Sequence, residues 1–371
     1  MKMKKILSMT AALAAVSAFS LAGCTSTDEE SASPTGDVAA VGFPADSTIG
    51  VALPDKTSEN WVLAGKLFED GLAAAGFKAD VQYAPATSTV PEQQNQITAM
   101  ITNGAKVIII GAKDGAQLSA QVEAAKAAGI TVIAYDRLIM NTEAVDYYLA
   151  FDNFKVGELQ GQALLDGLAA KFPDKKSYNI ELFSGSPDDN NAGVFFNGAM
   201  SVLQLKIDDG TLTVVSGETD VKKTATQGWL AANSQQRMDT LLAGNYQSTD
   251  IHGVLAPNDN LARSILESCR AAGKPLPVLT GQDSEGASVT SIMDGEQYMT
   301  IYKDTRALVA HAVLMAQDLQ KGNAPEVNDT ESYDNTVKIV PSYLLAPIVV
   351  TKENAAEVYK ENPTLFPLTQ K

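Results

Sequence analysis

Short runs rich in valine, isoleucine and other strand-forming residues alternate along this chain with amphipathic segments of roughly a dozen residues or more. A segment of that length can carry the chain back over a sheet as a helix, so the alternation predicts parallel sheets covered by helices. The predicted strands of the first half are residues 49–53, 79–83, 107–110, 131–135 and 147–151, and the predicted helices are residues 61–75, 92–103 and a segment that ends at residue 128. The predicted fold class is α/β.

The same pattern begins again after residue 151. It predicts helices at residues 156–170, 192–205, 229–242 and 261–272, and strands at residues 178–183, 212–215, 251–255, 278–280 and 299–302. A chain of 371 residues has room for two such units, because domains average about 150 residues. We therefore expect two doubly wound lobes with parallel sheets.

Several classes of ligand are disfavoured by the sequence. The 44 acidic and 28 basic residues give a net charge of −16, which opposes nucleic-acid binding. No Gly-x-Gly-x-x-Gly follows the first predicted strand and no P-loop motif occurs, so nucleotide binding is unsupported. Two histidines and two cysteines offer little for a metal site, and the acidic run at residues 188–191 lacks the twelfth-position Glu of a calcium loop. We predict no cofactor and no metal.

The N-terminus has the order of a secretory signal. Lysines at positions 2, 4 and 5 precede an apolar run at residues 6–20, which is too short for a stable membrane span. The following Leu-Ala-Gly-Cys resembles the lipobox of bacterial lipoproteins, which predicts a signal peptide at residues 1–23 and a lipid anchor on Cys24. An ordinary cleaved signal is the alternative. Residues 24–45 are small and polar, which predicts a flexible tether and an extracytoplasmic, lipid-anchored protein.

Polar and aromatic side chains follow most of the predicted strands. Ligands of open α/β sheets bind beyond the carboxyl ends of the strands, so these side chains are candidate binding residues. Carboxylates accept hydrogen bonds from hydroxyls, Arg, Lys and Asn donate to them, and aromatic rings cover the apolar face of a sugar. An Asp or Asn at such a place is also often a helix N-cap, and a Trp often a core residue. The candidates are Lys56, Glu59, Asn60, Trp61, Asp114, Asp136, Arg137, Asp189, Asn191, Trp229, Asn258, Asp283 and Lys303.

Several motifs in order resemble one family, the xylose- and multiple-sugar-binding proteins of ATP-driven bacterial importers. They are Tyr-Asp-Arg-Leu-Ile at residues 135–139, Phe-Asp-Asn at 151–153, Gly-Ser-Pro-Asp-Asp-Asn-Asn-Ala at 185–192, Gly-Gln-Asp at 281–283, Tyr-Lys-Asp-Thr-Arg at 302–306 and Val-Pro-Ser-Tyr-Leu at 340–344. The resemblance covers residues 48–352. It implies a type I periplasmic-binding-protein fold, in which three crossing segments join two lobes and a monosaccharide lies between them.

The resemblance also implies how the chain is divided. The N-terminal lobe would comprise residues 46–151 and 304–342, and the C-terminal lobe residues 152–303 and 343–371. The crossings would lie near residues 151–153, residue 303 and residues 342–345. Carried over by position, Asp136, Arg137, Asp189, Asn191, Trp229, Asn258, Asp283 and Lys303 would contact the sugar, with Trp61 as a further aromatic wall.

One position departs from the family pattern. Relatives often have Ser-Glu-Arg-Trp where this chain has Ser-Glu-Asn-Trp at residues 58–61. Asn60 is shorter than Arg and neutral, so the pocket would be roomier there and would favour a hexose over a pentose. Water could fill the gap instead, Lys56 could replace the charge, or Asn60 could face solvent.

The predicted function is capture of a hexose or pentose by a monomeric receptor that delivers it to an ABC permease, without catalysis. Two alternatives stay open. A sugar-sensing subunit of a signalling receptor would use the same cleft. An extracellular glycosidase would need paired carboxylates, which Asp136, Asp189 and Asp283 could supply. The export signal and the missing helix-turn-helix exclude a transcription regulator of this fold.

Overall fold

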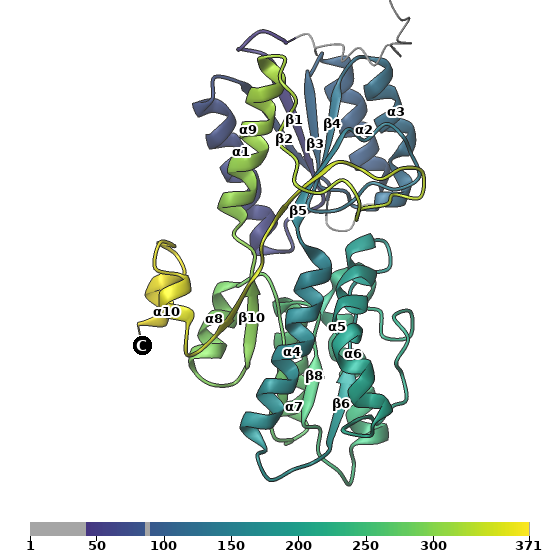
Figure 1. The fold of residues 1–371 in the computed structure, drawn as a ribbon, viewed down its shortest axis with the longest axis vertical. Coiled ribbons are helices and arrows are strands. Elements are labelled where there is room, and N and C mark those ends of the chain that lie inside the picture. Colours follow the sequence, from purple (N-terminus) through teal and green to yellow (C-terminus); the bar gives the residue numbers. More distant parts are fainter. Residues whose placement is uncertain (1–41, 86–89, 371) are drawn as a thin grey trace, which may run out of the picture. The chain divides into compact units, whose positions relative to one another are not determined.

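The first lobe is built on one six-stranded parallel sheet. The computed structural model describes residues 42–85 and 90–370. The strand order is β11, β5, β4, β3, β1, β2 (Figure 1). The strands are β1 (Thr48–Leu53), β2 (Lys78–Tyr83), β3 (Val107–Ile110), β4 (Thr131–Tyr135), β5 (Tyr147–Phe151) and β11 (Ser342–Leu345).

Both faces of this sheet are covered by helices because its central strands are apolar on both sides. In β3, Val107 and Ile109 belong to the core beneath α1 (Glu59–Ala74) and α9 (Thr305–Gln320). Ile108 and Ile110 belong to the opposite core, beneath α2 (Val90–Thr102) and α3 (Ser119–Ala127). Side chains alternate between the faces of a strand, so the unbroken Val-Ile-Ile-Ile run predicts this double cover.

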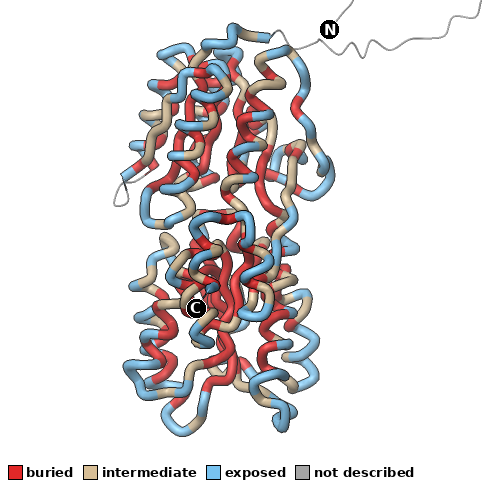
Figure 2. Tube along the Cα trace, turned by 90° about the vertical axis from the view of Figure 1, so that its left-hand side faces the viewer, coloured by how far each residue is buried: buried red, intermediate tan, exposed pale blue. Residues whose placement is uncertain are grey.

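The second lobe repeats the plan with a four-stranded parallel sheet in the order β7, β6, β8, β9. Its strands are β6 (Tyr178–Leu182), β7 (Leu212–Val214), β8 (Gly253–Leu255) and β9 (Val278–Leu279), and its main helices are α4 (Asn153–Lys171), α5 (Asn190–Asp208), α6 (Ala231–Asn245) and α7 (Asp259–Ala271). Beside the sheet lie α8 (Gly286–Met293), the short helix α10 (Ala355–Val358), and an antiparallel pair, β10 (Met299–Tyr302) with β12 (Ile348–Thr351). Buried residues, red in Figure 2, fill the interior of each lobe.

The chain passes between the lobes three times. It leaves the first sheet after β5 and enters α4, returns from β10 to α9, and leaves again from β11 to β12 (Figure 1). The third passage lies later than predicted, because Ser342–Leu345 pairs with β5 throughout and so remains in the first sheet. This extends the first lobe three residues beyond the predicted boundary at residue 342.

Three helices, α6, α8 and α9, differ from the sequence prediction. The helix predicted at residues 229–242 begins at Ala231, because Gly228 (φ 68°) and Trp229 (φ 54°) have left-handed backbone angles that a helix cannot contain. Helices α8 and α9 lie in segments where no helix was predicted. Cys269 is fully buried, and burial raises the pKa of its thiol to about 12.

The membrane predictions concern the N-terminal residues. The predicted signal peptide, Cys24 and most of the predicted tether lie outside the described residues. Among the residues that the structure describes, no helix has both the length and the apolar character that a bilayer span requires.

Candidate functional site

A cavity of about 100 Å³ is lined by the loops that follow strands of both lobes. Ten of the thirteen candidate residues line it. They are Asn60, Trp61, Asp136, Arg137, Asp189, Asn191, Trp229, Asn258, Asp283 and Lys303. The position agrees with the rule that ligands of parallel sheets bind beyond the carboxyl ends of the strands.

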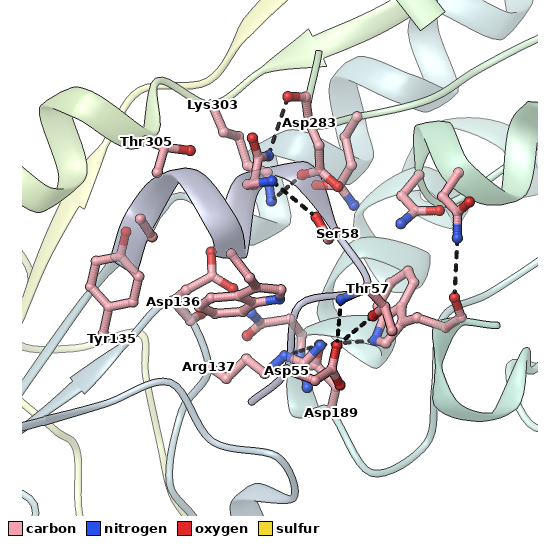
Figure 3. A pocket seen from close by; sticks show the side chains of 18 of the residues that line it. Asp55, Thr57, Ser58, Tyr135, Asp136, Arg137, Asp189, Asp283, Lys303 and Thr305 are labelled. Atoms are coloured by element: carbon pink, nitrogen blue, oxygen red, sulfur yellow. Dashed lines mark hydrogen bonds and ion pairs between the residues drawn. The ribbon is translucent and has the colours of Figure 1, made fainter. Parts of the chain in front are cut away.

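Asp189 connects the two lobes on one side of the cavity (Figure 3). It precedes α5, and its Oδ1 caps that helix by accepting from the Asn191 N–H at 3.0 Å. Its Oδ2 lies 3.1 Å from Nε of Arg137, in the other lobe, and accepts from the Trp229 indole at 3.2 Å. Burial raises the pKa of Asp189, although the Arg137 charge opposes that shift. The N-cap role and the cavity position therefore coexist in one residue.

Asp283 and Lys303 form a second charged pair, on another side of the cavity (Figure 3). Nζ of Lys303 lies 2.9 Å from Oδ1 of Asp283. Burial opposes the charge on Lys303, but the carboxylates of Asp283, Asp136 and Asp189 outweigh it and raise its pKa. The Lys303 ammonium is thus stabilised as a charged donor inside the site.

Three residues that line the cavity have a strained backbone. Asp136, Trp229 and Asp283 all have positive φ, at 61°, 54° and 98°. Such angles are uncommon in residues other than glycine and cluster at functional sites. At Asp136 the strained carbonyl oxygen accepts from Tyr148 and from Asn191 of the other lobe, both at 2.7 Å. Both of these bonds go to the backbone carbonyl, and neither uses the Asp136 carboxylate.

The two tryptophans of the chain both line the cavity, one from each lobe. The Arg137 guanidinium lies 5.6 Å from the Trp61 ring centre, and Tyr135 packs edge-on against the same ring. Trp229 rests against Gly185, where a Cβ atom would lie 2.1 Å from the indole. Gly185 therefore has to be glycine for Trp229 to keep this position.

Sequence reasoning missed a charged pair at the edge of the cavity. Asp55, after β1, and Lys113, after β3, both line it and form an ion pair. Burial opposes the charge on Asp55, but hydrogen bonds from Lys113 and Thr57 lower its pKa. The sequence prediction chose the neighbouring residue in each loop, Lys56 and Asp114. In an irregular loop, the number of residues between a position and the preceding strand does not determine where its side chain points.

The three remaining candidates lie outside the cavity lining. Lys56 is exposed and sits over the Tyr83 ring, 4.6 Å from its centre. Glu59 accepts from the Gly286 N–H at 3.1 Å, and Asp114 caps the short helical turn Gly115–Gln117. Asn60 does line the cavity and donates to the Asp283 carbonyl at 3.2 Å, so it is held between the lobes.

The lining suits a neutral ligand rich in hydroxyl groups. Carboxylates, amides and cations supply acceptors and donors on several sides, and indole rings supply flat apolar surfaces. Three of the five carboxylates that line the cavity, Asp55, Asp189 and Asp283, are each paired with a cation. No group of three or more potential metal ligands occurs among the described residues.

Comparison with known proteins gives the same picture. The family profile for the periplasmic binding protein domain matches residues 49–324. The chain is 49% identical to the multiple sugar-binding periplasmic receptor ChvE of Rhizobium radiobacter, over 86% of this chain and 91% of that protein. It is 37% identical to the D-xylose-binding periplasmic protein of Escherichia coli, over 82% of this chain and 87% of that protein.

A solved structure agrees with the fold. An ABC transporter solute-binding protein from Clostridium phytofermentans, crystallised with bound β-D-glucose, superposes with a TM-score of 0.82 at 40% identity. The match covers 88% of this chain and 100% of that chain. Together with the two parallel-sheet lobes and the three passages between them, these matches show that the chain belongs to the periplasmic binding protein family, with the type I fold.

Proposed function

We propose that this protein is an extracytoplasmic receptor that binds one monosaccharide between its lobes and delivers it to the membrane permease of an ATP-driven importer. The observation that carries the proposal is the cavity lining, in which both lobes supply charged hydrogen-bonding groups and an indole ring. Neither lobe completes this lining alone, so a bound sugar would hold the two together. The relatives named for sugars and the neighbour with bound glucose support the same ligand class.

The ligand class can be tested with purified protein and a panel of pentoses and hexoses in a thermal unfolding assay. A sugar at 100 times its dissociation constant should add about 2.7 kcal/mol to the free energy of unfolding. Stabilisation by at least one sugar and by none of a set of amino acids is expected. A panel without any stabilising sugar would contradict the proposal, and hydrolysis of an aryl glycoside would favour the glycosidase alternative.

We further propose that the ligand is a hexose in preference to a pentose. Asn60 stands where relatives often have Arg, and its side chain is tied to the Asp283 carbonyl across the cavity. Lys56 does not replace the missing charge, because it lies over Tyr83 instead. Asn60 is also shorter than Arg, so this end of the site would have more room, which suits the extra hydroxymethyl group of a hexose.

The proposed attachment to the membrane is a lipid on Cys24, with a monomeric receptor domain beyond the tether. Replacing this thiol as Cys24→Ser removes the atom that would carry the lipid. We expect the variant to leave the membrane fraction and wild-type protein to stay there, as measured by immunoblot of fractionated cells. Mass spectrometry that finds an unmodified Cys24 in wild-type protein would rule the anchor out.

A further inference from the structure

The loop that presents Asp283 has an unusual backbone. Asp283 (φ 98°) and the next residue, Ser284 (φ 54°), both lie in the left-handed region. Two consecutive residues other than glycine in this region are strained, and such a conformation persists only when its surroundings hold it. The loop needs a restraint, because the Asp283 carboxylate and carbonyl both have defined partners in the cavity.

Asp259 supplies that restraint from behind the loop. Its side chain is fully buried and lies outside the cavity lining that the described residues form. Its Oδ2 accepts from the Glu285 N–H at 3.0 Å and from the Thr300 hydroxyl at 3.0 Å. The same Thr300 oxygen accepts from the Ser284 N–H at 3.2 Å. Asp259 thus fixes, directly and through Thr300, the two residues that follow Asp283.

The packing around Asp259 leaves it little freedom. Its Oδ1 accepts from the Gln297 amide at 2.9 Å, and its own N–H donates to the Gln282 carbonyl at 3.1 Å. A Cβ atom at Gly281 would lie 2.1 Å from Oδ1, so the loop can approach the carboxylate only because residue 281 is glycine. The contact joins the loop after β9 to the start of α7, next to Asn258.

We propose that Asp259 is a positioning residue for ligand binding, which holds the 281–285 loop so that Asp283 faces the ligand and Lys303. The inference rests on the proposed function. In this proposal Asp259 does not contact the ligand, and it contributes to the affinity by keeping Asp283 in its binding position.

Glu181 provides a matched control. It is also fully buried in the second lobe, and it also accepts three hydrogen bonds, from the Ser216 N–H, the Ser216 hydroxyl and Tyr246. It does not line the cavity and contacts no residue of the 281–285 loop among the hydrogen bonds of the described chain. Glu181→Ala should therefore destabilise the fold as Asp259→Ala does, while sparing the affinity.

The first experiment compares these two variants by thermal unfolding and by calorimetric titration with the sugar that stabilises wild-type protein best. Both should lower the melting temperature. Asp259→Ala should raise the dissociation constant about tenfold or more, whereas Glu181→Ala should change it less than about twofold. Asp259→Asn should recover most of the affinity, because its carbonyl oxygen can still accept from Glu285 and Thr300. Equal affinity losses in the two alanine variants would overturn the proposal.

The second experiment is a double-mutant cycle with Asp283→Ala, which separates positioning from general damage. In the Asp283→Ala background, Asp259→Ala should change the dissociation constant less than about twofold, because the group it positions is gone. A full additional loss would overturn the inference. If Asp259→Ala does not fold, Thr300→Val takes its place in the cycle, with the same two outcomes. An Asp283→Ala protein that binds sugar as well as wild type would instead contradict the proposed function.

Discussion

At the scale of single residues, Asp136 and Asp283 are cavity carboxylates that come from opposite lobes, and each has a left-handed backbone conformation. A hydrogen bond to a charged group contributes roughly 1.5 to 3 kcal/mol, so Asp136→Ala and Asp283→Ala should each weaken sugar binding by about 10- to 150-fold. Calorimetric titration measures this, with Asp166→Ala on the surface of α4 as the control. Affinities within about twofold of wild type for both cavity variants would place the binding site elsewhere.

A single substitution at Asn60 can test the preference for a hexose over a pentose. Asn60→Arg restores the residue that relatives often have and fills the space with a planar donor. We expect the ratio of glucose to xylose affinity to fall by about tenfold or more, because the longer side chain competes with the hydroxymethyl group. Asn60→Ala, which adds no donor, should retain the hexose preference. A wild-type protein that prefers xylose, or an unchanged ratio in Asn60→Arg, would refute the hexose proposal.

At the scale of elements, His252 joins β6 and β8 through its ring. The Asn179 N–H donates to Nδ1 of His252 at 2.8 Å, and Phe172 packs edge-on against the imidazole. Burial, helped by the charge of Lys175, lowers the pKa of His252 below its ordinary value of 6.5. The folded state therefore resists protonation, and stability present above pH 6.5 is lost as the pH falls below that value towards the lower folded pKa.

The measurement is chemical denaturation between pH 7.5 and pH 5.5 for wild type and for His252→Gln, whose side chain does not titrate. The free energy of unfolding of the wild type should fall more steeply than that of the variant over this interval. Parallel curves would show that His252 does not contribute to the pH dependence. His311, whose pKa burial also lowers, titrates in both proteins and cancels from the comparison.

The elements of the fold were largely predictable from the sequence, and the loop details were not. Unbroken apolar runs such as residues 107–110 determine buried strands, because few other structures bury every residue of so short a segment. The start of α6 was predicted wrongly because nothing in the sequence forces Trp229 into a left-handed angle; the tertiary packing over Gly185 does. The same limit explains why Asp55 and Lys113 were missed beside Lys56 and Asp114.

At the scale of the whole molecule, we predict that binding draws the two lobes together. Asp136 and Arg137 belong to one lobe, and Asp189, Asn258 and Asp283 to the other, so only a closed arrangement offers a ligand the full set of contacts. The radius of gyration from small-angle X-ray scattering should therefore decrease on addition of sugar. An unchanged radius at saturating ligand, with Asp283→Ala at the same sugar concentration as the weakly binding control, would indicate that the lobes are already closed without sugar.

Strand β11 lies late in the sequence but belongs to the first sheet, and this constrains the order in which the two sheets can fold. The four strands of the second lobe's parallel sheet lie within residues 178–279, whereas the first sheet is not complete until Ser342–Leu345 has paired with β5. During synthesis, the second sheet can therefore form while β5 still has an open edge. The first sheet should therefore be completed after the second sheet, and the rate of that step should reflect the long loop closed between residues 151 and 342.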